Sequence, residues 1–263
     1  MATTILLPAP VASSAIRIGQ LLTDPLNPDV ESFVNEHDSF PLRAPSIQTG
    51  FQETISRDGS GRFIERQSHA SNATSILIQA DQMTHTTLRD PLSAFRYTSR
   101  RASSQSYLHK AALRRQPLYF VTATQRITNP RFEAKNDTTL ASEKAQVRRQ
   151  DSGVSLNEQD SDVIYAVELR KVFCRVGSPE EPQRPNDAGY AYKHYKLQGE
   201  DELQLAVGFG QPVTVTEFRA LVSLASDSDY TDESADSSDF EDEEDEGCMC
   251  CASSISNAAY RRY

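Results

Sequence analysis

Three cysteines lie close together near the carboxyl end of the chain, in the sequence Cys248-Met-Cys-Cys. Accessible thiols can be acylated, oxidised or bound to a soft metal ion. A tetrahedral metal site needs a fourth ligand, and no histidine or further cysteine lies nearby in the sequence. Because two acyl chains anchor a protein stably to a membrane and one does not, the cluster favours S-acylation of Cys248, Cys250 and Cys251. A run of acidic residues beside them would be repelled by an anionic leaflet, so oxidation stays an alternative.

No other residues have the spacing of a catalytic or metal centre. The sequence has no G-x-S-x-G, P-loop or H-E-x-x-H motif, and its five histidines are scattered. Glu36, His37 and Asp38 form a triplet that we interpret as a solvated turn, because adjacent loop residues point in different directions. Cys174 lies among apolar residues without an assignable base, which indicates a packed structural thiol. We therefore expect no enzymatic activity, no cofactor and no metal.

The most basic part of the chain is the stretch 88–115, which holds seven basic residues and a single acid, Asp90. Such a stretch can bind an anionic lipid surface or nucleic acid, or it can be a solvated helix balanced by acids elsewhere. Nucleic acid is the weaker binding hypothesis, because no recognised motif is present and the chain has a formal net charge of -10. The residues that we assign to lipid binding are Arg96, Arg100, Arg101, Lys110, Arg114 and Arg115.

The negative charge is concentrated near the carboxyl end. Residues 227–246 include twelve acids and no basic residue, whereas residues 1–226 carry 25 acidic and 25 basic groups. Low hydrophobicity and repelling charges oppose core formation, so we predict a folded domain over 1–226 and a disordered acidic tail over 227–263. The cysteines form no spaced disulfide framework, and neither a leader nor a spanning helix is encoded, which predicts a cytoplasmic protein.

Two stretches of the sequence are expected to form long strands. The stretch 162–176 is dense in β-branched and aromatic residues, and regular alternation would place Val163, Tyr165, Val167 and Leu169 on one face. Beyond these residues the apolar positions shift by one, which indicates a bulge or a change of face. The stretch 118–128 also alternates, with Tyr119 and Val121 on its apolar face, and half of this strand is expected to stay wet.

The other elements follow from hydrophobic period and from turn and capping signals. Thr214 and Glu217 form a capping box in front of the last helix. Together these elements predict an α+β fold, a twisted antiparallel sheet with flanking helices. In chain order we expect a short helix and a second helical turn within 12–35, a hairpin within 47–63, a strand or helix at 74–83, an amphipathic helix ending before Pro117, loops over 134–161 and 177–186, a hairpin of 190–197 with 203–209, and a helix over 215–225.

Several of these stretches resemble the second half of fungal gasdermin-like proteins. They are P-L-Y-F-V-T-A-T-Q-R-I from Pro117, D-V-I-Y-A-V-E-L-R-K-V-F from Asp162, Y-K-H-Y-K-L, and V-T-V-T-E-F-R-A-L. The resemblance covers roughly residues 10–225 and rests on strand patterns. It implies the pore-forming-domain fold of that family over residues 1–226.

The resemblance also implies a function. Such a protein is recruited to the inner face of the plasma membrane, binds acidic phospholipids through basic residues, and oligomerises with itself or with a variant of the same family. It then forms a β-barrel pore that triggers regulated cell death in allorecognition. The chain departs from vertebrate gasdermins, because an acidic tail stands where they have a large helical domain. Strand residues expected to enter the membrane are Tyr119, Val121, Val163, Tyr165, Val167 and Leu169.

A second hypothesis comes from the acidic, serine-rich tail. A soluble adaptor could use such a tail to recruit basic partners and could be phosphorylated there. The serines that would be modified are Ser226, Ser234, Ser237 and Ser238.

Overall fold

The computed structural model describes residues 4–28, 31–34, 39–57, 64–65, 74–135, 162–178, 191–197 and 203–227. The acidic tail beyond Asp227 and its cysteine cluster, including the S-acylation prediction, lie outside the described residues. In chain order the elements are β1 (Ile5–Ala12), β2 (Leu21–Leu22), β3 (Ser32–Phe33), β4 (Ser46–Arg57), β5 (Ile64–Glu65), β6 (Thr74–Thr87), α1 (Pro91–Ser99), α2 (Ala102–Arg114), β7 (Leu118–Thr128), β8 (Arg131–Lys135), β9 (Asp162–Gly177), β10 (Ala191–Lys196), β11 (Gln204–Pro212) and α3 (Val215–Asp227).

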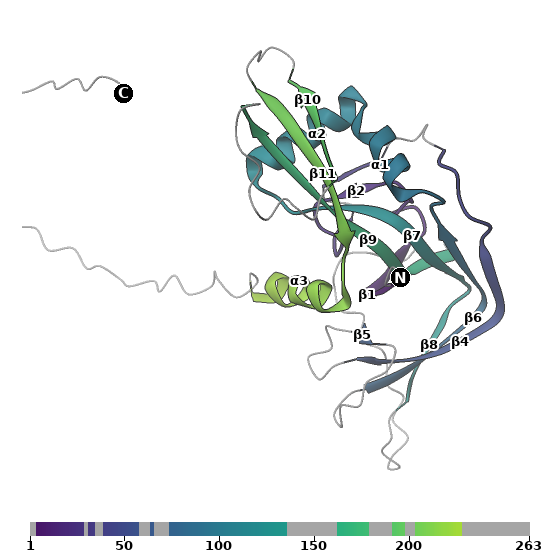
Figure 1. Ribbon diagram of the computed structural model, residues 1–263. Coiled ribbons are helices and arrows are strands. Elements are labelled where there is room, and N and C mark those ends of the chain that lie inside the picture. The colour runs from purple at the N-terminus through teal and green to yellow at the C-terminus, as the bar shows by residue number, and fades with distance from the viewer. Residues whose placement is uncertain are drawn as a thin grey trace, which may run out of the picture.

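All described strands belong to one antiparallel sheet with helices on both faces (Figure 1). The main strand order is β10-β11-β9-β7-β6-β4-β5, while β1 pairs with β9, β2 with β3 and β7, and β8 with β6. The predicted class, α+β with an antiparallel sheet, is confirmed.

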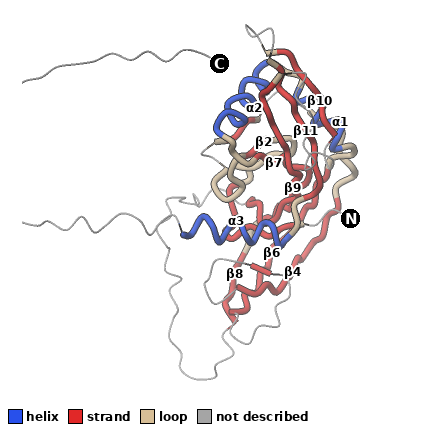
Figure 2. Tube along the Cα trace, turned by 60° about the vertical axis from the view of Figure 1, so that its left-hand side comes forward, coloured by secondary structure: helices blue, strands red, loops and turns tan. Residues whose placement is uncertain are grey.

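Alternate residues of β7 face two separate cores. Tyr119 and Val121 pack in the cluster that includes Phe218 of α3, whereas Phe120 packs in the cluster that includes Phe95 of α1. Successive side chains of a strand point to opposite faces, so α3 covers one face of the sheet while α1 and α2 cover the other. Figure 2 shows α3 running across the sheet, apart from α1 and α2. The predicted wet face of β7 is therefore wrong: β7 has the predicted bounds but is buried on both faces along most of its length.

β9 is the central strand, with β7 on one edge and β1 and β11 sharing the other. Its expected single apolar face is wrong. Val163 and Tyr165 pack in one cluster, whereas Val167 and Leu169 pack in the cluster beneath α3. The cause is a bulge, because the ladder between β9 and β7 skips Tyr165 and thereby inverts the facing of the residues that follow.

A change of face explains the second shift in the β9 pattern. Lys171 remains on the side of α3, where it forms an ion pair with Glu217. Val172 points the other way and packs with Phe209 in the cluster beneath α1 and α2. β9 therefore contributes its first apolar residues to one core and its last to another, without a bulge at Lys171.

β4 and β6 form a long antiparallel ladder at the other end of the sheet. The stretch 74–83, which the sequence left open between strand and helix, is thus a strand. β4 also pairs with β5, as the predicted hairpin requires, although the turn between these two strands lies outside the described residues. β8 was not predicted. It pairs with β6 beyond the end of β7. The chain turns between β7 and β8 at Asn129, which has φ 50°. The Asn129 side-chain amide donates a hydrogen bond to Asp81 at 2.7 Å. In Figure 1 the lower ends of β4 and β8 lie far from α1 and α2.

The helix expected within residues 12–35 is wrong for the residues described there. β1 precedes it, and its ladder with β9 is interrupted between Leu6 and Val11, where Pro8 and Pro10 lack an N–H group. Gly19 has φ +86°, which is not helical, and its N–H donates to the Val121 carbonyl at 2.9 Å. Hydrogen bonds to β7 therefore replace the predicted helical turns, and sequence-local periodicity could not show them.

The carboxyl-terminal elements agree with the sequence. β10 and β11 form the predicted hairpin. The capping box is also present, because the Thr214 N–H donates to Glu217 Oε2 at 2.9 Å and the Glu217 N–H donates to Thr214 Oγ1 at 3.3 Å. α2 ends before Pro117, as expected. These elements depend on local signals, which explains why the sequence predicts them well.

Candidate functional site

α1 holds the first of the predicted basic residues at a capped helix. Asp90 is its N-cap, and its carboxylate accepts hydrogen bonds from the Ser93 N–H at 3.1 Å and hydroxyl at 2.6 Å. These bonds hold the pKa of Asp90 below its usual value. The buried side of α1 includes Phe95, and the opposite side exposes Arg96 and Arg100. Both arginines therefore project from a well-anchored helix.

α2, like α1, exposes basic residues on the side that faces away from the sheet. Its buried residues include Leu108 and Ala111, while Lys110 and Arg114 are exposed. The helix ends at Arg115, whose φ of 54° is in the left-handed region, and the Arg115 N–H donates to the Ala112 carbonyl at 3.1 Å. A cation at this position also interacts favourably with the carboxyl end of the helix dipole.

Two of the six predicted lipid-binding residues are engaged within the protein. The Arg101 guanidinium lies 4.8 Å from the ring centroid of Tyr97 and donates to its hydroxyl at 2.5 Å. Arg114 donates to Glu31 at 2.6 Å, and Gln116 donates to the other oxygen of the same carboxylate at 2.5 Å. Glu31 therefore neutralises part of the charge at the end of α2.

The other four cations are available. Arg96, Arg100, Lys110 and Arg115 are exposed, and their side chains form no hydrogen bond or ion pair with the residues that the structure describes. Of these four, Arg96 lies close enough to the Asp90 carboxylate to help lower its pKa, so its charge is partly offset. The six predicted residues, on α1, on α2 and at the helix caps Arg100, Arg101 and Arg115, are called here the basic helical surface.

Exposed apolar side chains accompany these cations. Leu113 of α2 is 66% exposed and Tyr97 of α1 is 51% exposed. Leu113 is adjacent to Arg114 and one turn from Lys110, so an apolar group is surrounded by positive charge. Tyrosine and leucine beside lysine and arginine are typical of helices that lie at a membrane interface.

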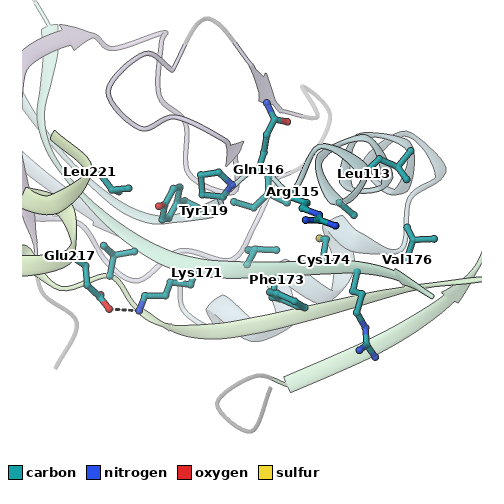
Figure 3. Close-up of a pocket in the computed structure, with 16 residues that line it drawn as sticks. Leu113, Arg115, Gln116, Tyr119, Lys171, Phe173, Cys174, Val176, Glu217 and Leu221 are labelled. Carbon is teal, nitrogen blue, oxygen red and sulfur yellow. Dashed lines mark hydrogen bonds and ion pairs between the residues drawn. The ribbon is translucent and has the colours of Figure 1, made fainter. Parts of the chain in front are cut away.

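A cavity of about 920 Å³ adjoins this surface (Figure 3). It lies between the end of α2, the start of β7, the second half of β9, and α3, and Leu113 and Arg115 line it together with residues of those strands. Lys171 and Glu217 form an ion pair in its wall, and this bond lowers the pKa of Glu217. Burial raises the pKa of Cys174 to about 12, so this thiol stays protonated and unreactive at neutral pH.

The predicted membrane strand residues lie in the core. Tyr119 and Val121 of β7 and the four apolar positions chosen on β9 are all at most 7% exposed. They pack against α3, β1 and the residues of β4 and β6. For these side chains to meet lipid, the sheet would have to give up those contacts.

One polar pair within the sheet was missed by the sequence argument. His85 Nε2 lies 3.6 Å from Glu168 Oε1, and the same nitrogen lies 3.1 Å from Thr87 Oγ1. A catalytic relay uses one imidazole nitrogen for the carboxylate and the other for the nucleophile. Since a single nitrogen makes both contacts, this cluster lacks that geometry. The sequence could not indicate this pair, because the histidine and the glutamate lie on different strands and meet only through the register of the sheet.

Within the described parts of the chain, no group of three or more histidine, cysteine or acidic residues could hold a metal ion. None of the described helices is long and apolar enough to cross a membrane.

No protein-family model matches the chain, and neither does any curated protein.

Proposed function

We propose that this chain is a membrane-targeted, pore-forming protein of the gasdermin-like type that first binds acidic phospholipids through the basic helical surface. The observation that carries the proposal is that α1, α2 and their caps carry four exposed cations without an ion pair to the described residues, together with exposed Tyr97 and Leu113. Positive charge provides attraction to an anionic leaflet, and the apolar groups provide shallow insertion.

The expected binding strength follows from the charge. Each basic residue near an anionic leaflet contributes about 1 kcal/mol, so the four exposed cations contribute at most roughly 4 kcal/mol. This corresponds to about a thousandfold in the binding constant, and the effect falls as salt screens the charges. Arg101 and Arg114 add less, because Tyr97 and Glu31 already engage them.

Strand length supports the pore-forming part of the proposal. β6, β7 and β9 have 14, 11 and 16 residues, and a membrane strand needs about 9 to 11. On this proposal, chains of the same or a variant type associate on the inner leaflet, and the sheet exchanges its packing against helices for contact with lipid. Regulated cell death in allorecognition would be the consequence of the pore.

Vesicle sedimentation tests the binding step. The five-residue variant has glutamine at Arg100, Arg101, Lys110, Arg114 and Arg115, and it should lose nearly all binding to vesicles that contain phosphatidylserine. A matched control replaces five exposed cations outside the surface, so that the net charge changes equally. These control positions are Arg17, Arg43, Arg131, Lys196 and Arg219. Equal loss in both variants would contradict a localised surface, and full binding by the first would overturn the proposal.

Dye release tests the second step. Purified protein, alone and mixed with a variant chain of the same type, should release a trapped dye from acidic vesicles and leave neutral vesicles intact. A protein that binds vesicles but never releases dye would reduce the proposal to membrane recruitment. A protein inert in both assays would favour a soluble adaptor.

A further inference from the structure

Ser103 lies among the residues of the basic helical surface, two positions after Arg101 and three after Arg100, in the sequence Arg100-Arg101-Ala-Ser. Its side chain is exposed and forms no hydrogen bond with the described residues. The next serine, Ser104, has arginine three positions before it but is fully buried. Ser106 is exposed, yet its third preceding residue is Ser103. Exposure and flanking charge thus coincide at Ser103.

Ser103 lies in the first turn of α2, where no side chain caps the helix. Arg101 is the N-cap in extended conformation, and the first turn of the helix has no acidic residue. The Gln105 N–H makes a helical hydrogen bond to the Arg101 carbonyl at 2.9 Å. The earlier N–H groups, including that of Ser103, have no such partner in a helix and are available to an added acceptor.

We propose that Ser103 is a phosphorylation site for a serine/threonine kinase that recognises arginines two and three positions before the acceptor. Acidic groups of such a kinase would form charge-assisted hydrogen bonds with Arg100 and Arg101. The Ser103 hydroxyl oxygen attacks the γ-phosphorus of ATP, the bond to the β-phosphate oxygen breaks, ADP leaves, and the hydroxyl proton passes to the kinase base.

The phosphate has two effects, both set by its position. At the second residue of α2 it can accept hydrogen bonds from free N–H groups, and its negative charge is favoured by the helix dipole. It therefore supplies the cap that α2 lacks. It also adds a charge of about -2 beside Arg100 and Arg101, which lowers the attraction of the basic helical surface to an anionic leaflet. This second effect rests on the proposed function.

Phosphate incorporation tests the site directly. The purified full chain is incubated with an arginine-directed kinase and ATP, and modified residues are located by mass spectrometry. We expect modification at Ser103 and its loss in Ser103→Ala, while Ser106→Ala, at an exposed serine of the same helix, keeps it. A chain that stays unmodified at Ser103 would overturn the assignment. Thermal unfolding tests the cap, because a capping phosphate raises the midpoint, and an unchanged or lower midpoint contradicts it.

Vesicle binding tests the switch. Two neutralised charges weaken binding to phosphatidylserine vesicles by about 30-fold. Ser103→Ala treated in the same way should bind like the untreated chain. If the phosphorylated and unmodified chains bind equally, the switch is refuted although the site stands. If the unmodified chain binds no vesicles, the proposed function fails, and incorporation and thermal unfolding still decide whether Ser103 is the acceptor and caps α2.

Discussion

Substitution of Phe218 tests whether α3 must leave the sheet in the proposed pore-forming step. The ring is fully buried in the cluster that also holds Val167 and Leu169 of β9. α3 is further attached by the Lys171–Glu217 ion pair, which is exposed and adds little. If β9 contacts lipid in the pore, α3 must first separate from this face. Phe218→Ala should then accelerate dye release from acidic vesicles.

The size of the effect follows from burial. Replacing a buried aromatic ring by alanine costs about 3 to 5 kcal/mol, whereas Phe218→Leu keeps a large apolar side chain and should cost less. Folded domains have roughly 5 to 15 kcal/mol of stability, so a weakened but folded protein is expected for at least the milder variant. If all of the lost folding free energy lowers the barrier to freeing α3, the rate of dye release increases about tenfold for each 1.4 kcal/mol.

The assay compares urea unfolding and dye release for both variants with Phe132→Ala. Phe132 is 43% exposed on β8, so the same chemical change there should lower stability little and leave release unchanged. The expected order of release rates is Phe218→Ala, Phe218→Leu, then the control and the unmodified chain. Variants that are folded and less stable but release dye no faster would show that α3 need not leave.

Three further results are expected. Gly19→Ala should cost clearly more stability in urea than Gly50→Ala, because both have positive φ but an added Cβ at Gly19 would lie 2.3 Å from the Phe40 ring, and at Gly50 it meets open space; equal costs would contradict the steric argument. Burial raises the pKa values of Cys174 and Tyr107 from 9.0 and 10.0 to about 12. The folded state therefore holds these protons longer, so the contribution of these two groups to stability is fully present below about pH 9 and is lost as pH rises toward 12. Cys174→Ala should flatten this fall in urea midpoints. Truncation after Ser226 should strengthen vesicle binding, with a gain that shrinks at high salt, if the acidic tail folds back over the basic helical surface. Unchanged binding would leave the tail as a solubilising segment.

Local signals made much of this fold predictable. The capping box at Thr214 and Glu217, the bounds of β7 and the exposed cations of α2 depend on neighbours in sequence, and the structure has them as expected. Long-range pairing explains the errors. Ile18 and Leu22 lie four positions apart, as on one face of a helix, but they pack in different core clusters, and sheet hydrogen bonds at Gly19 replace the helix.

The basic helical surface was predictable only in part. Sequence identified its six cations from charge alone, but it could not show that Glu31, far away in the chain, engages Arg114. Nor could it show that Leu113 and Tyr97 stay exposed, since their spacing also suits a buried face. The cavity beside Arg115 depends on α2, β9 and α3 meeting, which no local pattern encodes.

The bulge at Tyr165 connects the fold to the proposed pore. In the sequence, Val163, Tyr165, Val167 and Leu169 alternate regularly, as a membrane strand with one lipid face requires. In the structure the bulge divides them between two cores. Removing one bulge would bring all four onto one face, so the proposed insertion would require β9 to straighten. An environment-sensitive dye attached to a cysteine at each position from 163 to 169, in a chain without its native cysteines, should report lipid at every second position. A pattern that changes phase at Tyr165 would show that the bulge persists and that β9 does not insert as a regular strand.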